Sequence, residues 1–222
     1  MGCTRQQLNV FFDDLLTPQR FKDYCPNGLQ VEGKTDVRHL VTGVTASQAL
    51  IEAARDRGAD AILVHHGYFW RSEPPCIIGM KAERVRALIQ ADINLFAYHL
   101  PLDCHPLHGN NAALGRLMGI EAPEALDPED PGTPVFRGQF EASVTARELA
   151  DRLSIALDRT PLLIGEGDVK SVAWCTGAGQ GYIDLAADAG ADVYVTGEVS
   201  EQTAHVALER GIAFIGAGHH AT

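Results

Sequence analysis

Two adjacent histidines, His65 and His66, follow the apolar run 61–64, which predicts a short buried strand. Successive side chains on a strand point to opposite faces, so neighbouring histidines inside a strand would be poor ligands for one metal ion. At the frayed end of a strand, where Gly67 lets the backbone turn, they can reach two different ions. The pattern favours a two-metal site. The alternative is one buried and one surface histidine at a strand end.

Further donors follow another predicted strand, 93–98, which leads to His99 and Asp103. The second half of the chain then repeats the first. "GADAILVHHG" (58–67) matches "GADVYVTGEV" (190–199), and "ADINLFAYHLPLD" (91–103) matches "RGIAFIGAGHHAT" (210–222). This repeat places His219 opposite His99 and Glu198 opposite His66. It also predicts a carboxylate at position 223, as the partner of Asp103.

A mixed set of imidazole and carboxylate donors suits zinc, iron, manganese, cobalt or nickel, and the donor types do not choose among these metals. A carboxylate such as Asp103 can bridge two ions roughly 3.5–4 Å apart, and the ions can share and acidify a water molecule. The predicted chemistry is therefore attack by a hydroxide near neutral pH.

Three other candidates leave alternatives open. His99 is either a donor that orients a ligand or substrate, or a ring packed at a strand end. Glu198 and His205 are seven residues apart, close to two helical turns and so on one helix face, where they could act as a general base or support the metal ligands. The alternative for this pair is an acid at a helix N-terminus and a surface histidine.

Two motifs near these candidates are also ambiguous. The glycine-rich stretch 177–181 could cradle a phosphate with its amides, or it could be a tight turn between a strand and a helix. The aromatic residues Tyr68, Phe69 and Trp70 could wall a pocket and stack on a base, or they could belong to the core.

Strands and helices alternate in both halves, which indicates an α/β fold. Capping boxes at Thr4 and Thr145 each predict the start of an amphipathic helix. We expect two related three-layer α/β/α units from an internal duplication. The first covers residues 1–122, an acidic, proline-rich linker covers 123–136, and the second covers 137–222. Loops at the carboxyl ends of such strands form sites, so we expect the metals in the cleft between the units.

Composition excludes several classes of protein. The chain has 222 residues, 45% of them hydrophobic, and no apolar run approaches the roughly 18 residues of a membrane span. Its five cysteines are scattered, without a C-x-x-C pair, and no secretory signal opens the sequence, so we expect a cytoplasmic protein with reduced thiols. A net charge of −11 argues against a large nucleic-acid footprint. An acidic protein that handles an anionic substrate would need bound cations.

Several long strings together resemble one family, the dinuclear metal-centre hexamers, whose bacterial members are commonly labelled GTP cyclohydrolase I type 2 homologues. These strings are "DYCPNGLQVEG", "VTGVTASQAL", "VHHGYFW", "HLPLDCHP", "GNNA", "VAWCTGAGQ", "TGEVSEQTAH" and "AGHHAT". The resemblance implies that His65, His66, Asp103 and His219 are metal ligands, and that the last ligand is a glutamate at position 223. It makes Glu198 and His205 pocket residues. It also implies two divalent ions per chain and a toroidal homohexamer.

The residues and the resemblance together predict a dinuclear-metal-dependent hydrolase. The family label implies GTP as the small-molecule substrate, with hydrolytic opening of the purine imidazole ring. One alternative is a non-enzymatic metal-binding scaffold or regulatory protein, and another is a metal-dependent phosphoesterase.

Overall fold

The computed structural model describes residues 2–130 and 132–222 and divides into two compact units, Met1–Leu102 (unit 1) and Asp103–Thr222 (unit 2). Both units have an α/β architecture, as the sequence predicts. The boundary lies at Leu102, earlier than the predicted linker 123–136, because Leu114, Met118 and Ile120 pack into the core of unit 2.

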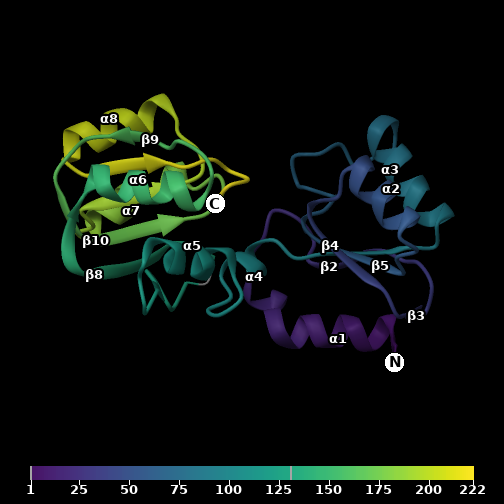
Figure 1. Ribbon diagram of the computed structural model, residues 1–222. Helices are drawn as coiled ribbons and strands as arrows, with labels where there is room; N and C mark the ends of the chain where they lie inside the picture. The colour runs from purple at the N-terminus through teal and green to yellow at the C-terminus, as the bar shows by residue number, and fades with distance from the viewer. Residues whose placement is uncertain (1, 131) are drawn as a thin grey trace. The chain divides into compact units, whose positions relative to one another are not determined.

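The described part of unit 1 contains a four-stranded sheet with helices on both faces (Figure 1). The strand order is β2 (Gly28–Val31), β6 (Asn94–Ala97), β5 (Ala61–His66) and β4 (Leu40–Thr45). Strands β4, β5 and β6 are parallel, and β2 runs antiparallel to β6. A small antiparallel pair, β1 (Cys3–Thr4) and β3 (Asp36–Val37), accompanies the sheet.

The alternation of side chains along β5 explains these layers. Ile62 and Val64 pack in the cluster with helices α2 (Gln48–Asp56) and α3 (Gly79–Gln90). Ala61 and Leu63 face the opposite cluster, with helix α1 (Arg5–Leu16). A strand buried on both faces is typical of parallel sheets that helices cover on both sides.

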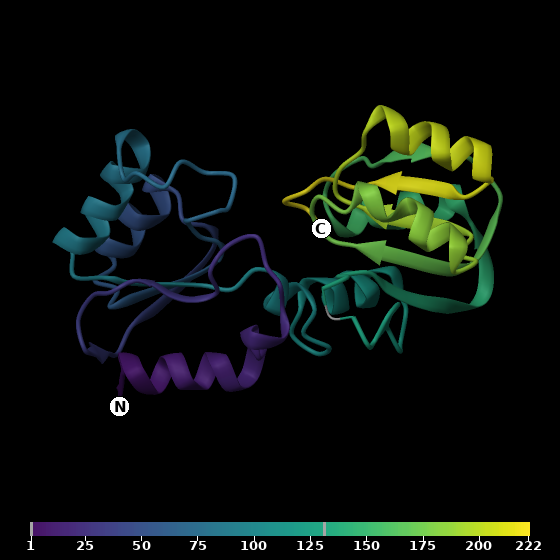
Figure 2. The same ribbon diagram turned by 180° about the vertical axis from the view of Figure 1, so that it is seen from behind.

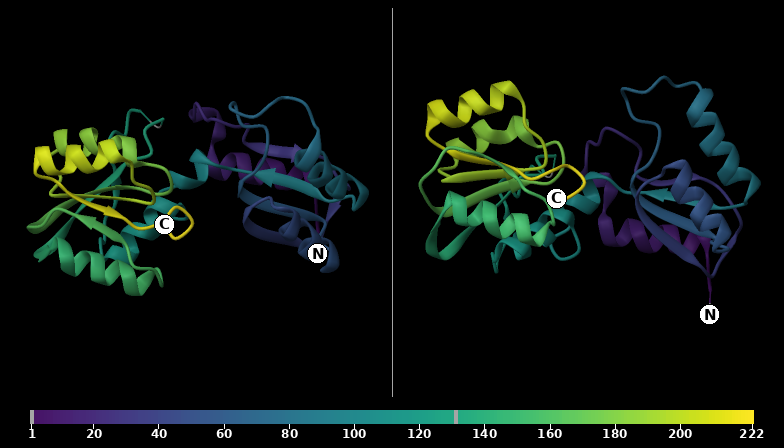
Figure 3. Two further views of the ribbon diagram at one scale, coloured as in Figure 1. Left: turned by 90° about the horizontal axis from the view of Figure 1, so that it is seen from above. Right: turned by 45° about the horizontal axis from the view of Figure 1, so that its top comes forward.

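Unit 2 repeats this plan with a larger sheet, six-stranded within its described residues. Its parallel strands are β10 (Asp168–Cys175), β11 (Val193–Thr196) and β12 (Ala213–Gly216), flanked by the antiparallel strands β7 (Glu124–Ala125), β8 (Phe136–Thr145) and β9 (Leu162–Ile164). Helices α5 (Asn110–Met118) and α6 (Ala146–Ala156) cover one face; α7 (Ile183–Asp188) and α8 (Glu201–Arg210) cover the other. Helix α7 faces the viewer in Figure 2, which is seen from behind, and the left view of Figure 3 shows the layers of unit 2 from above.

The two units share local interactions as well as strand order. Thr4 and Thr145 each cap a helix with a complete capping box, and they pair with Asp36 and Asp168 at the same point of the fold. A carboxylate oxygen of Asp60 accepts backbone hydrogen bonds from Arg38 and His39. Asp192 accepts the equivalent pair from Lys170 and Ser171. These shared interactions support an internal duplication.

Several elements differ from the sequence prediction. No strand is predicted within the segment 23–33, which contains β2, because the turn-forming residues Asn27 and Gly28 stand at the start of that strand. The predicted linker includes β7, the first residue of β8 and Pro131, which lies outside the described residues. Strand β8 has exposed residues at most positions, so its apolar pattern is weak and gave no signal.

The described cysteines are all free thiols, as their spacing predicts. None of the helices in the described ranges is long and apolar enough to cross a membrane.

The anchoring carboxylate of Asp60 gives a stability prediction. It pairs with Lys34 at 2.9 Å and accepts the two backbone N–H groups, and although burial raises its pKa, these bonds lower it to about 2. Its contribution is therefore complete above an unfolded pKa of about 3.9 and is lost as the pH falls through about 2. We expect Asp60→Asn to lower the free energy of unfolding by about 1–2 kcal/mol at pH 7.

Urea unfolding of both proteins between pH 7 and pH 2 measures this difference. The difference in the free energy of unfolding between the natural protein and Asp60→Asn should stay constant down to about pH 4 and shrink at lower pH. Asp36→Asn, at an exposed position of β3, is the matched control and should change stability by less than about 0.5 kcal/mol. A difference that grows on acidification would contradict the assignment.

Candidate metal centre

Three histidines meet at the carboxyl end of the sheet of unit 1. His65 and His66 end β5, and His99 follows β6, the neighbouring parallel strand. The ring centroids lie 4.5 Å apart for His65 and His66 and 4.9 Å apart for His65 and His99. One donor nitrogen from each ring lies within 4.8 Å of the other two, a spacing that can hold a metal ion.

The hydrogen bonds of His65 and His99 fix which nitrogen of each ring carries the lone pair. His65 Nδ1 lies 3.1 Å from the carbonyl oxygen of Tyr98, and His99 Nδ1 lies 2.7 Å from Asp23 Oδ1. Both partners only accept, so each Nδ1 donates its hydrogen, and in the neutral ring Nε2 carries the lone pair. His66 Nδ1 lies 3.4 Å from the hydroxyl of Thr45. A metal-binding histidine is held through its other nitrogen in the same manner.

Asp23 is the buried anchor of His99. Its carboxylate accepts hydrogen bonds from the backbone N–H groups of Tyr24 and Leu100, from Asn27 Nδ2 and from His99. Burial alone would raise its pKa, but the hydrogen bonds from His99, Asn27 and Leu100 together lower it. Asp23 is therefore an ionised partner that orients the imidazole.

Asp23, Cys25 and His99 also have ligand atoms within 4.8 Å of one another. This second donor set is the poorer metal site. The four hydrogen bonds of Asp23 already occupy its lone pairs. Burial and the charges of Asp23 and Glu73 raise the pKa of the Cys25 thiol to about 12, so it is protonated at neutral pH. The three histidines fit a metal ion better.

Gln30, which lies a few residues after Asp23 in the sequence, holds the loop that follows His66. Gln30 Nε2 donates to the carbonyl of Tyr68 at 3.1 Å, and the amide of Tyr68 donates back to Gln30 Oε1 at 2.7 Å. Asn27 likewise accepts the backbone N–H of His99 at 2.7 Å. These side chains tie the loop to β2 and fix the histidines.

The aromatic residues after Gly67 have different surroundings. Tyr68 belongs to the core, with 3% exposure and its hydroxyl donating to Ala46. Phe69 has a left-handed φ of 66°, an unusual conformation for a bulky residue, and lies under Lys81. This turn places Trp70 edge-on against His99, with centroids 4.9 Å apart. Trp70 therefore lies against both His66 and His99.

In unit 2, Asp103 is 7% exposed at the end of the short helix α4 (Leu100–Asp103). Its Oδ1 accepts hydrogen bonds from Asn110 at 2.8 Å and from the hydroxyl of Thr176 at 3.2 Å. The buried side chain of Asn111 accepts the amide of Thr176 and donates to the carbonyl of Asp103. Asp103 is thus rigidly placed at the carboxyl end of β10.

His219 follows β12 and has a carboxylate partner, as His99 has. Its Nδ1 lies 2.7 Å from Glu198 Oε1, which assigns the hydrogen to Nδ1 and the lone pair to Nε2. Two glycines make room for His219: a Cβ at Gly177 would lie 3.2 Å from Nε2 of its ring, and one at Gly197 would lie 2.7 Å from its backbone Cα.

The expected pairing of Glu198 with His205 on one helix face is wrong. Helix α8 begins at Glu201 with Ser200 as its N-cap, so Glu198 precedes the helix. Glu198 instead orients His219, and His205 is exposed on α8.

The glycine-rich stretch after β10 is a tight turn. The amide of Gly177 donates to the hydroxyl of Thr222, and the amide of Gly179 donates to that of Thr196. These amides are used inside the protein, which argues against the phosphate cradle. The carboxylate expected at position 223 would follow Thr222 and stays a prediction.

The residues that sequence reasoning missed are the orienting partners: Asp23, Asn27, Gln30, Thr45, Asn110 and Thr176. Three of them, Asp23, Asn27 and Gln30, lie in the string "DYCPNGLQ", but nothing in that string indicates that they orient histidines.

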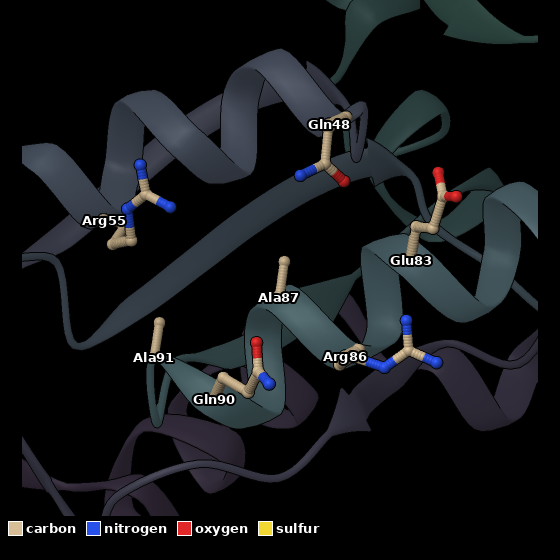
Figure 4. A pocket seen from close by; sticks show the side chains of 7 residues that line it. All are labelled: Gln48, Arg55, Glu83, Arg86, Ala87, Gln90 and Ala91. Carbon is tan, nitrogen blue, oxygen red and sulfur yellow. The ribbon is translucent and has the colours of Figure 1, made fainter.

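A separate pocket of about 520 Å³ lies between α2 and α3 (Figure 4). Its lining consists of Gln48, Arg55, Glu83, Arg86, Ala87, Gln90 and Ala91. None of the candidate ligands lines it, so it is distinct from the histidine cluster.

Comparison with known proteins identifies the family. The model of Duf34/NIF3 (NGG1p interacting factor 3) matches residues 3–222, which include all of the donors described above. The chain belongs to the Duf34/NIF3 family.

Relatives in this family are named GTP cyclohydrolase 1 type 2 homolog. The chain is 54% identical to the one from Pseudomonas aeruginosa over 211 residues, covering 95% of this chain and 84% of that protein. It is 53% identical to the one from Vibrio cholerae over 220 residues, covering 97% and 87%.

Two solved structures show the same fold. The structural-genomics protein ybgI has a TM-score of 0.91 and 49% identity, over 98% of this chain and 87% of that one. The protein TTHA1606 from Thermus thermophilus has a TM-score of 0.89 and 36% identity, over 99% and 88%.

The anchoring of His99 by Asp23 predicts an effect on metal affinity. Asp23→Asn keeps the size of the side chain but removes its negative charge and replaces one of its two accepting oxygens with an NH2 donor, which disrupts the network that holds the hydrogen on His99 Nδ1. We expect it to weaken Zn²⁺ or Co²⁺ binding about 10- to 100-fold, the usual cost of losing such a partner. Competition with a chromophoric chelator measures the affinity.

Asp56→Asn, an exposed residue of α2, is the control and should bind the metal as the natural protein does. A thermal melt checks that both variants are folded. Unchanged affinity in folded Asp23→Asn would show that His99 does not take part in binding.

Proposed function

We propose that this protein is a metal-dependent hydrolase that acts on a nucleotide. The observation that carries the proposal is the shared state of His65, His99 and His219: Nδ1 of each donates to a fixed acceptor, which leaves the lone pair on Nε2. Metal-binding histidines are held in this way. The names of the relatives support GTP as the substrate, with opening of the purine imidazole ring.

We propose His65, His66, Asp103 and His219 as ligands of two divalent ions. Their mixture of imidazole and carboxylate donors suits zinc, iron, manganese, cobalt or nickel. Such ions, when bound, lower the pKa of water enough to supply a nucleophile near neutral pH.

The remaining residues have supporting roles in this proposal. Asp23 and Glu198 hold the rings of His99 and His219 in one tautomer and one orientation. His99 then presents Nε2 beside His65, where it can bind an ion or accept a hydrogen from the substrate. His205 stays a candidate at the surface of α8.

The metal and the activity are tested together. The purified protein should contain about two ions per chain and should turn over GTP in a saturable, metal-dependent reaction. Two ions without turnover of GTP or of a panel of phosphoesters would indicate a metal-binding scaffold. Turnover of the phosphoesters alone would indicate a phosphoesterase, and fewer than one ion would contradict the dinuclear site.

The ligand assignment is tested by substitution. His66→Ala and Asp103→Ala should each lose metal, measured by elemental analysis after gel filtration. His108→Ala is the matched control, since the amide of His108 donates to His105 and its ring stacks on that residue. Equal metal loss in the control would show that the ligands are wrongly chosen.

We also propose a homohexamer. Helix α1 leaves the apolar residues Val10, Phe11 and Leu15 exposed, which supports association. Light scattering should give a mass about six times the 23.9 kDa of one chain. A monomeric mass at micromolar concentration would contradict it.

A further inference from the structure

Trp70 is a half-buried indole beside the histidine cluster of unit 1. Its ring centroid lies 5.9 Å from that of His66 and 4.9 Å from that of His99, with the ring planes at 62° and 81°. Trp174, by contrast, is fully buried in the core of unit 2. An aromatic side chain that keeps part of its surface open beside convergent polar groups is typical of a ligand site.

Hydrogen bonds hold the indole in place. Trp70 Nε1 donates to the carbonyl of Gly67 at 3.1 Å, and the carbonyl of Trp70 accepts the amide of Glu73 at 2.9 Å. The amide of the next residue, Arg71, donates to the carbonyl of Tyr24 at 2.8 Å. Because Nε1 is the only polar atom of the side chain and is already paired, the open surface of Trp70 is apolar and aromatic. The ligand that fits it is flat and aromatic.

The turn before Trp70 is strained. Phe69 has a φ of 66°, in the left-handed region that bulky residues rarely adopt. Glu73 accepts the amide of Phe69 at 3.2 Å, and Lys81 pairs with Glu73 at 3.2 Å and lies over the Phe69 ring. Such residues persist where their surroundings hold them, and they cluster at active sites and ligand clamps. Here the strained turn directs Trp70 toward the histidines.

A second partly exposed aromatic ring borders the same cluster. Tyr24 is 54% exposed, and its ring centroid lies 6.4 Å from that of His99. Its amide donates to Asp23, the carboxylate that orients His99. Aromatic surface is therefore available to a ligand from two loops beside His99.

The proposed reaction requires the base of the nucleotide, rather than its phosphates, to lie beside the metal ligands, because the bond that opens belongs to the purine imidazole ring. We propose that the purine of the substrate stacks on Trp70, with Tyr24 bordering it. Stacking uses the π-face that every base has, so it positions the ring without reading its hydrogen-bonding edge. This inference rests on the proposed function and names the residue that holds the base of its substrate.

Calorimetry with the Zn²⁺-loaded protein, at low temperature to slow turnover, tests the inference. It compares GTP with ribose 5-triphosphate, which has the same sugar and phosphates without the base. The natural protein should bind GTP about tenfold more tightly, a factor equal to about 1.4 kcal/mol and within the range usual for stacking one base. Trp70→Leu should abolish this preference through weaker binding of GTP alone, and Trp70→Phe should retain most of it. Phe11→Leu, at an exposed aromatic residue of α1, is the matched control and should keep the full preference.

Two further measurements separate stacking from a structural role. Trp174 is fully buried, so quenching of tryptophan fluorescence by a stacked base reports on Trp70. GTP should quench the emission of the natural protein, and ribose 5-triphosphate should not; this reading needs no variant. Trp70→Leu should also contain as much metal as the natural protein, measured by elemental analysis.

Equal binding of GTP and ribose 5-triphosphate by the natural protein, or an unchanged preference in folded Trp70→Leu, would overturn the inference. Equal weakening of both ligands, or loss of metal, in Trp70→Leu would also overturn it, because Trp70 would then act only on the structure of the site. In each of these cases metal-dependent turnover of GTP by the natural protein would leave the proposed function intact. Failure of the natural protein to bind or turn over GTP would overturn both.

Discussion

The carboxylate of Asp23 accepts four hydrogen bonds in the interior of unit 1, and the histidine cluster depends on them. Two come from backbone amides on either side of the cluster, at Tyr24 and Leu100. The others come from Asn27 and from the ring of His99. One buried charge therefore fixes the position of two chain segments and the tautomer of one imidazole. Removing a partner from such a network leaves a buried charge uncompensated, which is strongly unfavourable.

A carboxylate also orients a histidine ring at the sheet of unit 2, with different residues. Glu198 stands at the position of His66 in the repeat, and it holds His219 as Asp23 holds His99. The parallel strands in both units present their carboxyl ends on one edge, so donors placed there by short loops come together in each unit. The two units share this arrangement of parallel strands, while the donors at the edges of their sheets differ.

The sequence predicted most of the scaffold. Capping boxes at Thr4 and Thr145 located two helix starts, and the apolar run before His65 located β5, because both signals are local. Strand β8 was missed because its exposed face breaks the apolar pattern. The boundary between the units was predicted too late in the chain, because the packing of α5 on α6 is a contact between distant residues, which composition does not encode.

The residues of the candidate site also fall into two groups, those that the sequence revealed and those that only the structure shows. Histidines at strand ends were visible in the sequence, since their residue type and position suggest chemistry on their own. Asp23 and Thr176 were not visible, because each acts through a hydrogen bond to a residue 76 or 73 positions away. The helical pairing of Glu198 with His205 failed because spacing was used without locating the start of α8.

Gly197 limits which side chains the edge of the sheet in unit 2 can carry. It occupies the position of His65, and a Cβ there would lie 2.6 Å from the carbonyl oxygen of Gly177. Any side chain at this position requires the turn at Gly177 to move first. A chain with paired histidines at both edges therefore cannot be reached from this one by single substitutions at the edge.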